Sequence, residues 1–114
     1  MNIKRGEIYL AALDPVLGKE ISKIRPVVII SNNKNNLFSG TVTILPISSQ
    51  NIDKIYPFEL FLPKGSGNLP KNSKVKADQI RTIDKIRIIR HMGTLKKEEV
   101  DDIDKTIKIH LDLS

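Results

Sequence analysis

The 114-residue chain is predicted to be mainly β, a small antiparallel barrel or sandwich that ends in one amphipathic helix. The first observation is a succession of short runs, rich in β-branched and aromatic residues and bounded by turn residues, over most of the chain. The second is a change after residue 94, where apolar residues recur at spacings of three and four. The length fits a single domain, residues 1–114, that can bury a real core.

Six segments have the composition of strands. The clearest contains VVII (residues 27–30), because consecutive β-branched residues are typical of a strand buried on both faces. In another, FELFL (residues 58–62), Glu59 and Phe61 alternate with apolar residues, as in a strand with one face more exposed. In chain order the predicted strands are Glu7–Leu13, Pro26–Ser31, Thr41–Ile47, Phe58–Leu62, Lys74–Gln79 and Ile86–Ile89.

Three stretches between these strands are expected to be loops. Asp14–Ile24 is long and of mixed charge, and Asn32–Gly40 is asparagine-rich and suggests a wide hairpin. Pro63–Ser73 has the Gly, Ser, Asn and Pro content of a flexible connection. Loops longer than usual in a compact domain are more often functional than decorative.

The C-terminal segment has the single apolar stripe of a helix that packs in a core or an interface. Gly93-Thr94 supplies a break and an N-cap, and acidic residues follow near the positive end of the helix dipole. His110 lies beside the stripe, where we expect it to pack, and His91 is expected in a solvated turn. The stripe consists of Val100, Ile103, Ile107 and Leu111.

The net charge of +6 is unevenly spread along the chain. Residues 1–94 hold 15 Lys and Arg against seven Asp and Glu, a net +8, whereas residues 95–114 carry −2. A basic body favours a polyanionic partner, with nucleic acid the leading candidate, although surplus lysine also serves solubility. We expect a soluble, intracellular protein, since there is no Cys, no N-terminal apolar segment and no apolar run near the ~20 residues of a membrane span.

Known catalytic motifs for metal ions, nucleotide phosphates and activated serines do not occur, so a set of polar residues at strand ends becomes the candidate site. Most of them have an ordinary structural explanation as caps, turns or ion pairs. Arg25 is the exception, because Pro26 fixes its own φ and biases residue 25 toward an extended conformation. The set comprises Lys19, Glu20, Arg25, Asn32, Ser48, Ser49, Asp78, Gln79, Arg81 and Thr82.

Four stretches carry a resemblance that covers essentially the whole chain. They occur in this order: KRGEIYLAALDPVLGKE, IRPVVIISN, TVTILPISSQ and QIRTIDKIRI. Together with the C-terminal helix, they resemble the MazF/PemK/Kid toxins of bacterial type II toxin–antitoxin systems. The resemblance implies an SH3-like antiparallel barrel of the PemK/Kid/CcdB type, acting as a homodimer in the cytoplasm. It also implies a sequence-specific mRNA interferase, a single-stranded RNA endoribonuclease that needs no metal or other cofactor and is neutralised by a MazE-like antitoxin.

The resemblance assigns the family's catalytic arginine to Arg25 and its catalytic hydroxyl, usually a threonine, to Ser48. It implies attack by the substrate 2′-hydroxyl, which leaves a 2′,3′-cyclic phosphate and a 5′-hydroxyl. Ser49 is an alternative source of the hydroxyl, and Glu20 or the substrate itself is a candidate base. The residues expected to bind RNA are Lys19, Glu20, Asn32, Ser49, Asp78, Gln79 and Arg81.

Two other functions remain open at this point. A barrel of the same fold with a decayed active site would bind nucleic acid or protein without cleaving it, and serine in place of the usual threonine is the one hint in its favour. A topoisomerase-poisoning toxin fits by analogy of fold but does not account for Arg25 with a hydroxyl at position 48.

Overall fold

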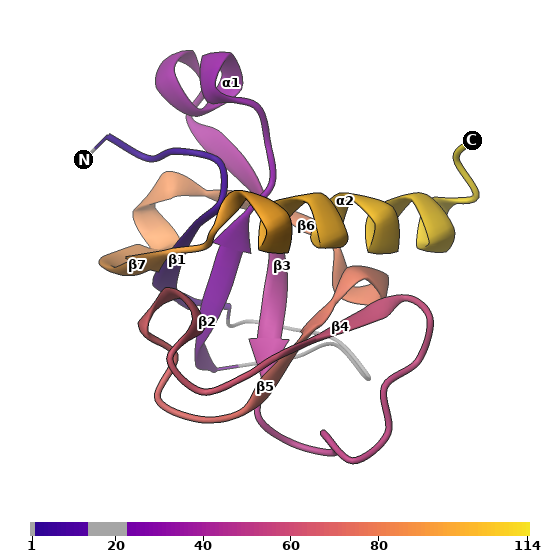
Figure 1. The fold of residues 1–114 in the computed structure, drawn as a ribbon. Helices are drawn as coiled ribbons and strands as arrows, with labels where there is room; N and C mark the ends of the chain where they lie inside the picture. The colour runs from indigo at the N-terminus through magenta and orange to yellow at the C-terminus, as the bar shows by residue number, and fades with distance from the viewer. Residues whose placement is uncertain (1, 14–22) are drawn as a thin grey trace.

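The computed structural model describes residues 2–13 and 23–114. Seven strands and two α-helices form the described part of the fold (Figure 1). The strands are β1 (Glu7–Ala12), β2 (Ile24–Ile29), β3 (Thr41–Ser48), β4 (Glu59–Leu62), β5 (Ser73–Lys76), β6 (Arg81–Asp84) and β7 (Ile88–Thr94). The helices are α1 (Asn33–Phe38) and α2 (Lys97–Leu111). Short 3₁₀ turns lie at Ser66–Asn68, Ala77–Gln79 and Lys85–Arg87.

The strands form one antiparallel sheet in the order β4-β5-β3-β2-β1-β7, with β6 paired to β3 beside this path. β3 is the longest strand and pairs with β2, β5 and β6. The predicted fold class is confirmed, with one correction to its shape. The sheet curls but is not closed into a barrel, and its order runs from β4 at one end to β7 at the other.

Each face of the sheet carries its own apolar core, as the alternation of side chains along β1 to β3 requires. On one face Ile8, Val28 and Leu45 pack with Ile103 of α2, which lies across the sheet in Figure 1. The other face buries a second cluster, which includes Tyr9, Val27, Val42, Ile29 and Ile44. The VVII strand is therefore buried on both faces, as its composition predicted.

The start and end of α2 differ from the sequence prediction. β7 continues through Thr94, so the helix begins after Lys96, whose N–H donates to Glu99 Oε1 at 2.9 Å. Ile103 is buried, but Leu111 at the end of the predicted stripe is exposed. The stripe is thus a core contact only over the first turns of the helix.

Three segments have a different structure from the one predicted. Residues 33–38 form α1 instead of a hairpin, because Asn32 caps the segment: its Oδ1 accepts the N–H of Asn35 at 2.9 Å. The strand predicted over residues 74–79 ends at Lys76 and continues as a 3₁₀ turn, and the following strand β6 was not predicted. The last predicted strand begins later, at Ile88, and is longer. Residues 14–22 of the first predicted loop lie outside the described residues.

His91 is in β7 instead of a turn. Its Nε2 lies 3.2 Å from Glu7 Oε2, and its ring meets Tyr9 edge-on at 5.2 Å between centroids. Tyr9 donates its hydroxyl to Glu7 Oε1 at 3.0 Å. Burial, followed by that hydrogen bond and the charge of Glu7, raises the pKa of Tyr9. The three side chains therefore join β1 to β7 through polar contacts.

Candidate active site

The pairing of β2 with β3 brings the two predicted catalytic residues to neighbouring strand ends. The pairs run from Ile29 with Ile44 to Val27 with Pro46, and Arg25 and Ser48 each lie two residues beyond the last pair. Arg25 is near the start of β2, and Ser48 ends β3.

The two candidate serines have different surroundings. Ser48 is only 7% exposed, and its Oγ accepts the N–H of Gln50 at 3.2 Å. Ser49 is exposed and lines a pocket of about 220 Å³ together with Ile47 and with Arg25 at the start of β2. Ser48 is thus the buried serine at the end of β3, and Ser49 is the one that shares a pocket with Arg25.

Arginines from β6 and the following turn are bound to the end of β1. Arg81 Nη1 donates to the carbonyl of Leu13 at 3.3 Å, and Arg87 Nη1 donates to that of Ala12 at 3.2 Å. Residues 14–22 continue from this point, and the predicted RNA-binding residues Lys19 and Glu20 lie outside the described residues.

Sequence reasoning missed Arg87, although it lies in the QIRTIDKIRI stretch. Arg81 is the first residue of β6, which was itself not predicted, and Arg87 ends the turn that follows this strand.

The other predicted RNA-binding residues are distributed unevenly. Asp78 and Gln79 lie in the 3₁₀ turn between β5 and β6, and both are half-buried. Asp78 Oδ1 is buried and has no hydrogen-bond partner among the described residues, with Lys76 Nζ 3.9 Å away. Asn32 follows the far end of β2 from Arg25, and its side-chain oxygen is used to cap α1. The structure therefore does not bring Asn32 beside Arg25 and Ser48 of the same chain.

A buried ion cluster, which we call the Glu59 clamp, lies under the loop that follows Ser49. It consists of Glu59, Lys74 and Lys76, and the side chains of Glu59 and Lys74 are 1% and 5% exposed. Glu59 Oε1 accepts from Lys74 Nζ at 3.0 Å, and Oε2 accepts from Lys76 Nζ at 2.5 Å. The sequence interpretation that placed Glu59 on an exposed face of FELFL is wrong.

Lys74 of the clamp also holds the loop itself. Its Nζ donates to the carbonyl of Asn51 at 3.1 Å and to that of Lys54 at 3.2 Å, while the N–H of Tyr56 donates to Glu59 Oε1 at 3.0 Å. The Glu59 carboxylate thus accepts from Lys74, Lys76 and the Tyr56 N–H, and Lys74 Nζ donates all three of its protons. The clamp fixes the chain directly after Ser48 and Ser49 against β4 and β5.

The Glu59 clamp is expected to lower the stability of the fold at acid pH. Burial alone would raise the pKa of Glu59, but the hydrogen bonds from Lys76, the Tyr56 N–H and Lys74 outweigh it and hold the pKa below its usual 4.5. A depressed folded-state pKa contributes stability that is present above the unfolded value and is lost as pH falls through the folded value. Urea midpoints measured from about pH 7 to about pH 3 should therefore fall below about pH 4.5. The urea midpoint of the Glu59→Gln variant should fall less over this pH range. An equal fall in the variant and in the wild-type protein would contradict the role of Glu59.

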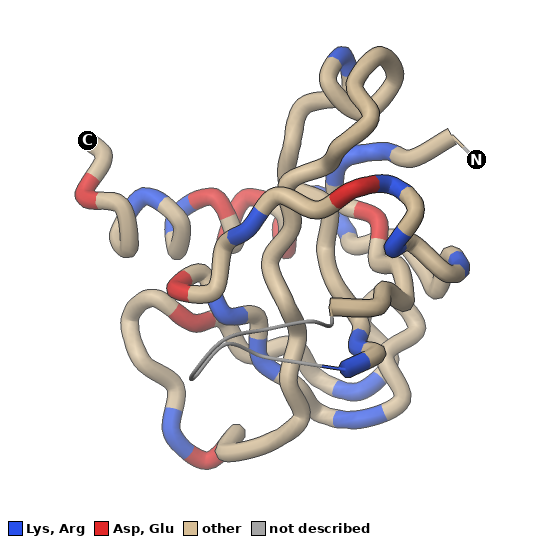
Figure 2. Tube along the Cα trace, turned by 180° about the vertical axis from the view of Figure 1, so that it is seen from behind, with Lys and Arg blue, Asp and Glu red and all other residues tan. Residues whose placement is uncertain are grey.

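The basic character of the molecule belongs to the sheet and its loops, as the sequence predicted. Figure 2 shows Lys and Arg positions in excess there, whereas α2 carries acidic and basic positions side by side. No helix among the described residues is long and apolar enough to cross a membrane. Within the same residues, no three His, Cys, Asp or Glu side chains are grouped so that they could hold a metal ion.

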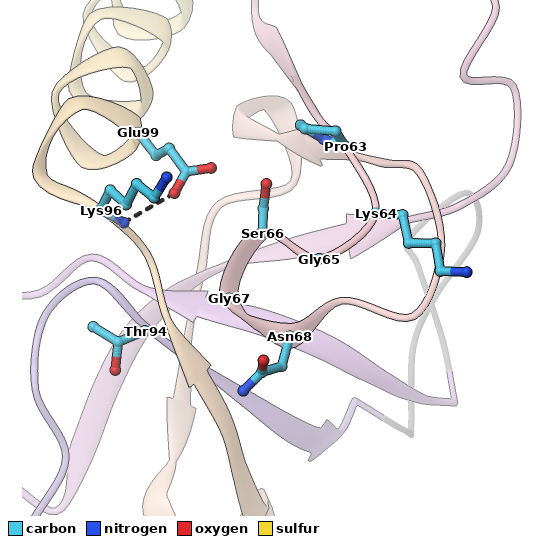
Figure 3. A pocket seen from close by; sticks show the side chains of 9 residues that line it. All are labelled: Pro63, Lys64, Gly65, Ser66, Gly67, Asn68, Thr94, Lys96 and Glu99. Carbon is cyan, nitrogen blue, oxygen red and sulfur yellow. Dashed lines mark hydrogen bonds between the residues drawn. The ribbon is translucent and has the colours of Figure 1, made fainter.

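A larger pocket of about 400 Å³ lies behind the β4–β5 connection (Figure 3). Loop residues from Pro63 to Asn68 form one side of it, and Thr94, Lys96 and Glu99 form the other. None of the predicted site residues lines this pocket. It is separate from Arg25 and Ser48.

Known proteins that are similar to this chain in sequence and in fold include toxins of one type. The family model of the PemK-like, MazF-like toxin of type II toxin–antitoxin systems matches residues 4–111. Endoribonuclease MazF9 of Mycobacterium tuberculosis (strain ATCC 25618 / H37Rv) is 38% identical over 97% of this chain and 98% of its own. The crystal structure of MazF from Deinococcus radiodurans has a TM-score of 0.84 at 23% identity, covering 98% of both chains. A mycobacterial endoribonuclease in complex with its cognate antitoxin has a TM-score of 0.75 at 20% identity, covering 99% and 96%.

The curled antiparallel sheet with its C-terminal helix is the fold of the small MazF-type toxins. The match over residues 4–111 and the 38% identity go further than the fold. The chain belongs to the family of PemK-like, MazF-like toxins of type II toxin–antitoxin systems.

Proposed function

We propose that this toxin is an endoribonuclease that cleaves single-stranded RNA, mRNA in the cell, and that residues 1–114 act as one domain. The observation that carries the proposal is the position of Arg25 and Ser48 at neighbouring ends of the paired strands β2 and β3. A guanidinium and a hydroxyl so placed suit a phosphodiester, because a planar fork of N–H donors matches two phosphate oxygens. The 38% identical relative is itself named an endoribonuclease, which supports the same conclusion.

The proposed reaction is attack of the substrate 2′-oxygen on the adjacent phosphorus. The bond from phosphorus to the 5′-oxygen breaks, so the products carry a 2′,3′-cyclic phosphate and a 5′-hydroxyl. The protein supplies in-line positioning and stabilises the charge that develops on the phosphorane oxygens. Arg25 is the electrostatic clamp and not the base, because a guanidinium offers only N–H donors and no acceptor.

Ser48 is proposed as the second donor to the phosphate. Its Oγ accepts from the Gln50 N–H, which leaves its own proton free to donate to a phosphate oxygen. Asp78, Gln79 and Arg81 are proposed to bind RNA bases, with Lys19, Glu20 and Ser49 from the flanking segments and Asn32 at the far end of β2.

Replacing Ser48 tests which serine acts. Ser48→Ala should lower the single-turnover rate about tenfold, the value of one neutral hydrogen bond made in the transition state, whereas Ser48→Thr should cleave at near wild-type rate. Ser49→Ala should change KM more than the rate at saturating RNA. Should Ser49→Ala lose the rate and Ser48→Ala keep it, Ser49 and not Ser48 would be the donor.

The activity itself is tested by incubating the purified protein with a mixed-sequence RNA in the presence of EDTA. Cleavage that leaves 2′,3′-cyclic phosphate and 5′-hydroxyl ends supports the proposal, and sequencing the 5′ ends of the products gives the recognition motif. Products with 5′-phosphate ends, or no cleavage of any RNA, would contradict it and favour the decayed binding protein. Steep loss of RNA binding with added salt is expected from the +8 of residues 1–94.

Regulation is proposed to be by a cognate antitoxin, as in the mycobacterial complex. The basic face would attract an acidic, partly disordered segment that folds onto it and blocks access of RNA. Since its substrate is mRNA, the toxin is expected to act in the cytoplasm.

We also propose that the toxin is a homodimer. Phe38 and Ile86 are apolar and 80% and 87% exposed, and the hydrogen bond from Lys85 N–H to the Gly40 carbonyl joins the segments that carry them. Exposed apolar patches mark interaction sites. The double variant Phe38→Asp/Ile86→Asp should therefore be a monomer in multi-angle light scattering at a concentration where the wild-type protein is a dimer. A dimeric double variant would place the interface elsewhere.

A further inference from the structure

The pocket of about 220 Å³ beside Arg25 has apolar walls. Pro26 at the start of β2 and Ile47 in β3 form one wall, and Leu69 with Pro70 from the β4–β5 connection forms the other. Ligand pockets for drug-sized molecules start at about 300 Å³, so this one suits a single flat ring system and not a folded peptide segment.

The rim of the pocket is polar and basic. Ser49 and Lys71 both line it, and both are exposed, so their hydroxyl and ammonium groups are accessible at the entrance. Arg25 also lines the pocket, together with its neighbours Ile24 and Pro26. Two cationic residues therefore flank an apolar cavity, an arrangement complementary to a ring attached to a phosphodiester backbone.

The wall formed by the β4–β5 connection is already in place. Gly93 of β7 approaches it so closely that a Cβ there would lie 2.3 Å from the Gly67 carbonyl oxygen. Asn68 Nδ2 donates to the Met92 carbonyl at 2.8 Å, and the Gly65 N–H donates to the Leu69 carbonyl at 2.8 Å. Beyond Pro70, Ser73 Oγ donates to the Lys71 carbonyl at 2.9 Å. The pocket is therefore preorganised, as a recognition site requires.

We propose that this pocket binds one unpaired nucleobase of the RNA, from a nucleotide that flanks the scissile phosphodiester; the inference rests on the proposed ribonuclease activity. Arg25 is itself one of the residues that line the pocket. A phosphate bound by Arg25 can thus have its neighbouring base turned into the pocket. Aliphatic walls replace the aromatic platforms usual in such sites, since Phe, Trp and Tyr make up only 4% of the chain.

The rim also limits which base is read. Lys71 offers only hydrogen-bond donors, and Ser49 can donate or accept. Carbonyl oxygens on the base edge are the matching acceptors, so the pocket selects a keto base, uracil or guanine, over adenine.

The test combines a pocket-filling variant with substrates that lack one base. In a cleavable RNA, replacing the base that occupies the pocket with an abasic nucleotide should slow wild-type cleavage about tenfold. Ser49→Leu, which fills the pocket, should slow cleavage of the intact RNA by a similar factor and be insensitive to base removal at that one position. Lys71→Ala should lose the preference for a keto base there. Lys64→Ala, on the same connection but lining the larger pocket of Figure 3, should behave as the wild-type protein.

Each contrary outcome has a distinct meaning. One outcome is that Ser49→Leu and removal of a base lower the cleavage rate independently, so that their factors multiply at every position. That outcome would show that no base enters the pocket. Wild-type cleavage by Ser49→Leu, combined with loss of antitoxin inhibition, would assign the pocket to an antitoxin side chain and overturn the proposal. Failure of the wild-type protein to cleave any RNA is a separate result, because it contradicts the ribonuclease activity before the pocket is tested.

Discussion

Replacing Arg25 with alanine should slow cleavage of a good RNA substrate on the order of 10²-fold or more in single turnover. The physical reason is the loss of a preorganised, charge-assisted donor to the oxygens on which charge develops in the transition state. Pro26 and the β-branched strand behind it hold Arg25 at the mouth of β2, so its fork is aligned before substrate binds. Arg25→Lys should rescue poorly, because an ammonium is a point charge where the fork presents aligned donors.

The matched control for Arg25 is Arg90→Ala. Arg90 is exposed on β7, outside the proposed site, and its removal changes the net charge by the same amount. Single-turnover rates at saturating RNA, with circular dichroism to verify folding, separate loss of chemistry from loss of general electrostatic attraction. A folded Arg25→Ala protein that cleaves near the wild-type rate would remove Arg25 from the mechanism.

Replacing Glu59 with glutamine should lower the free energy of unfolding by about 3–5 kcal/mol. The substitution leaves Lys74 buried without a counterion, and an uncompensated buried charge costs more than the pair contributes. Urea denaturation measures the loss. Glu98→Gln, on the exposed first turn of α2, is the control and should stay within about 0.5 kcal/mol.

A second variant separates charge from packing in the Glu59 clamp. Glu59→Gln combined with Lys74→Met removes both buried charges, so much of the lost stability should return. If the double variant is no more stable than Glu59→Gln, the cost arises from lost packing around Glu59 and not from the unpaired Lys74. Cleavage by Glu59→Gln should also weaken, because Lys74 holds the loop that follows Ser48.

The sequence alone predicted the features that local patterns control. VVII predicted a buried strand, the change of apolar spacing predicted α2, and Arg25-Pro26 predicted the extended backbone found at the start of β2. The assignment of Arg25 and Ser48 as catalytic residues came from the resemblance and stays a prediction.

Features that depend on distant partners were not predictable. α1 is a separate case, because its partners are local: Asn36 Nδ2 donates to the Ser31 carbonyl at 2.8 Å, in an asparagine-rich segment whose composition favours a turn. Nothing local indicates that Glu59 will be buried, since Lys74 and Lys76 meet it only when β4 pairs with β5. β6 was missed because a four-residue strand with polar alternation has too little periodicity to detect.

The pairing of β1 with β7 has a consequence for the timing of toxicity. β1 emerges early from the ribosome, but its outer partner spans residues 88–94, so the sheet stays incomplete during most of synthesis. Pairings between such distant segments form slowly compared with local ones. We therefore expect the proposed ribonuclease activity to appear only after β7 has left the ribosome, when the sheet that carries Arg25 and Ser48 can be completed.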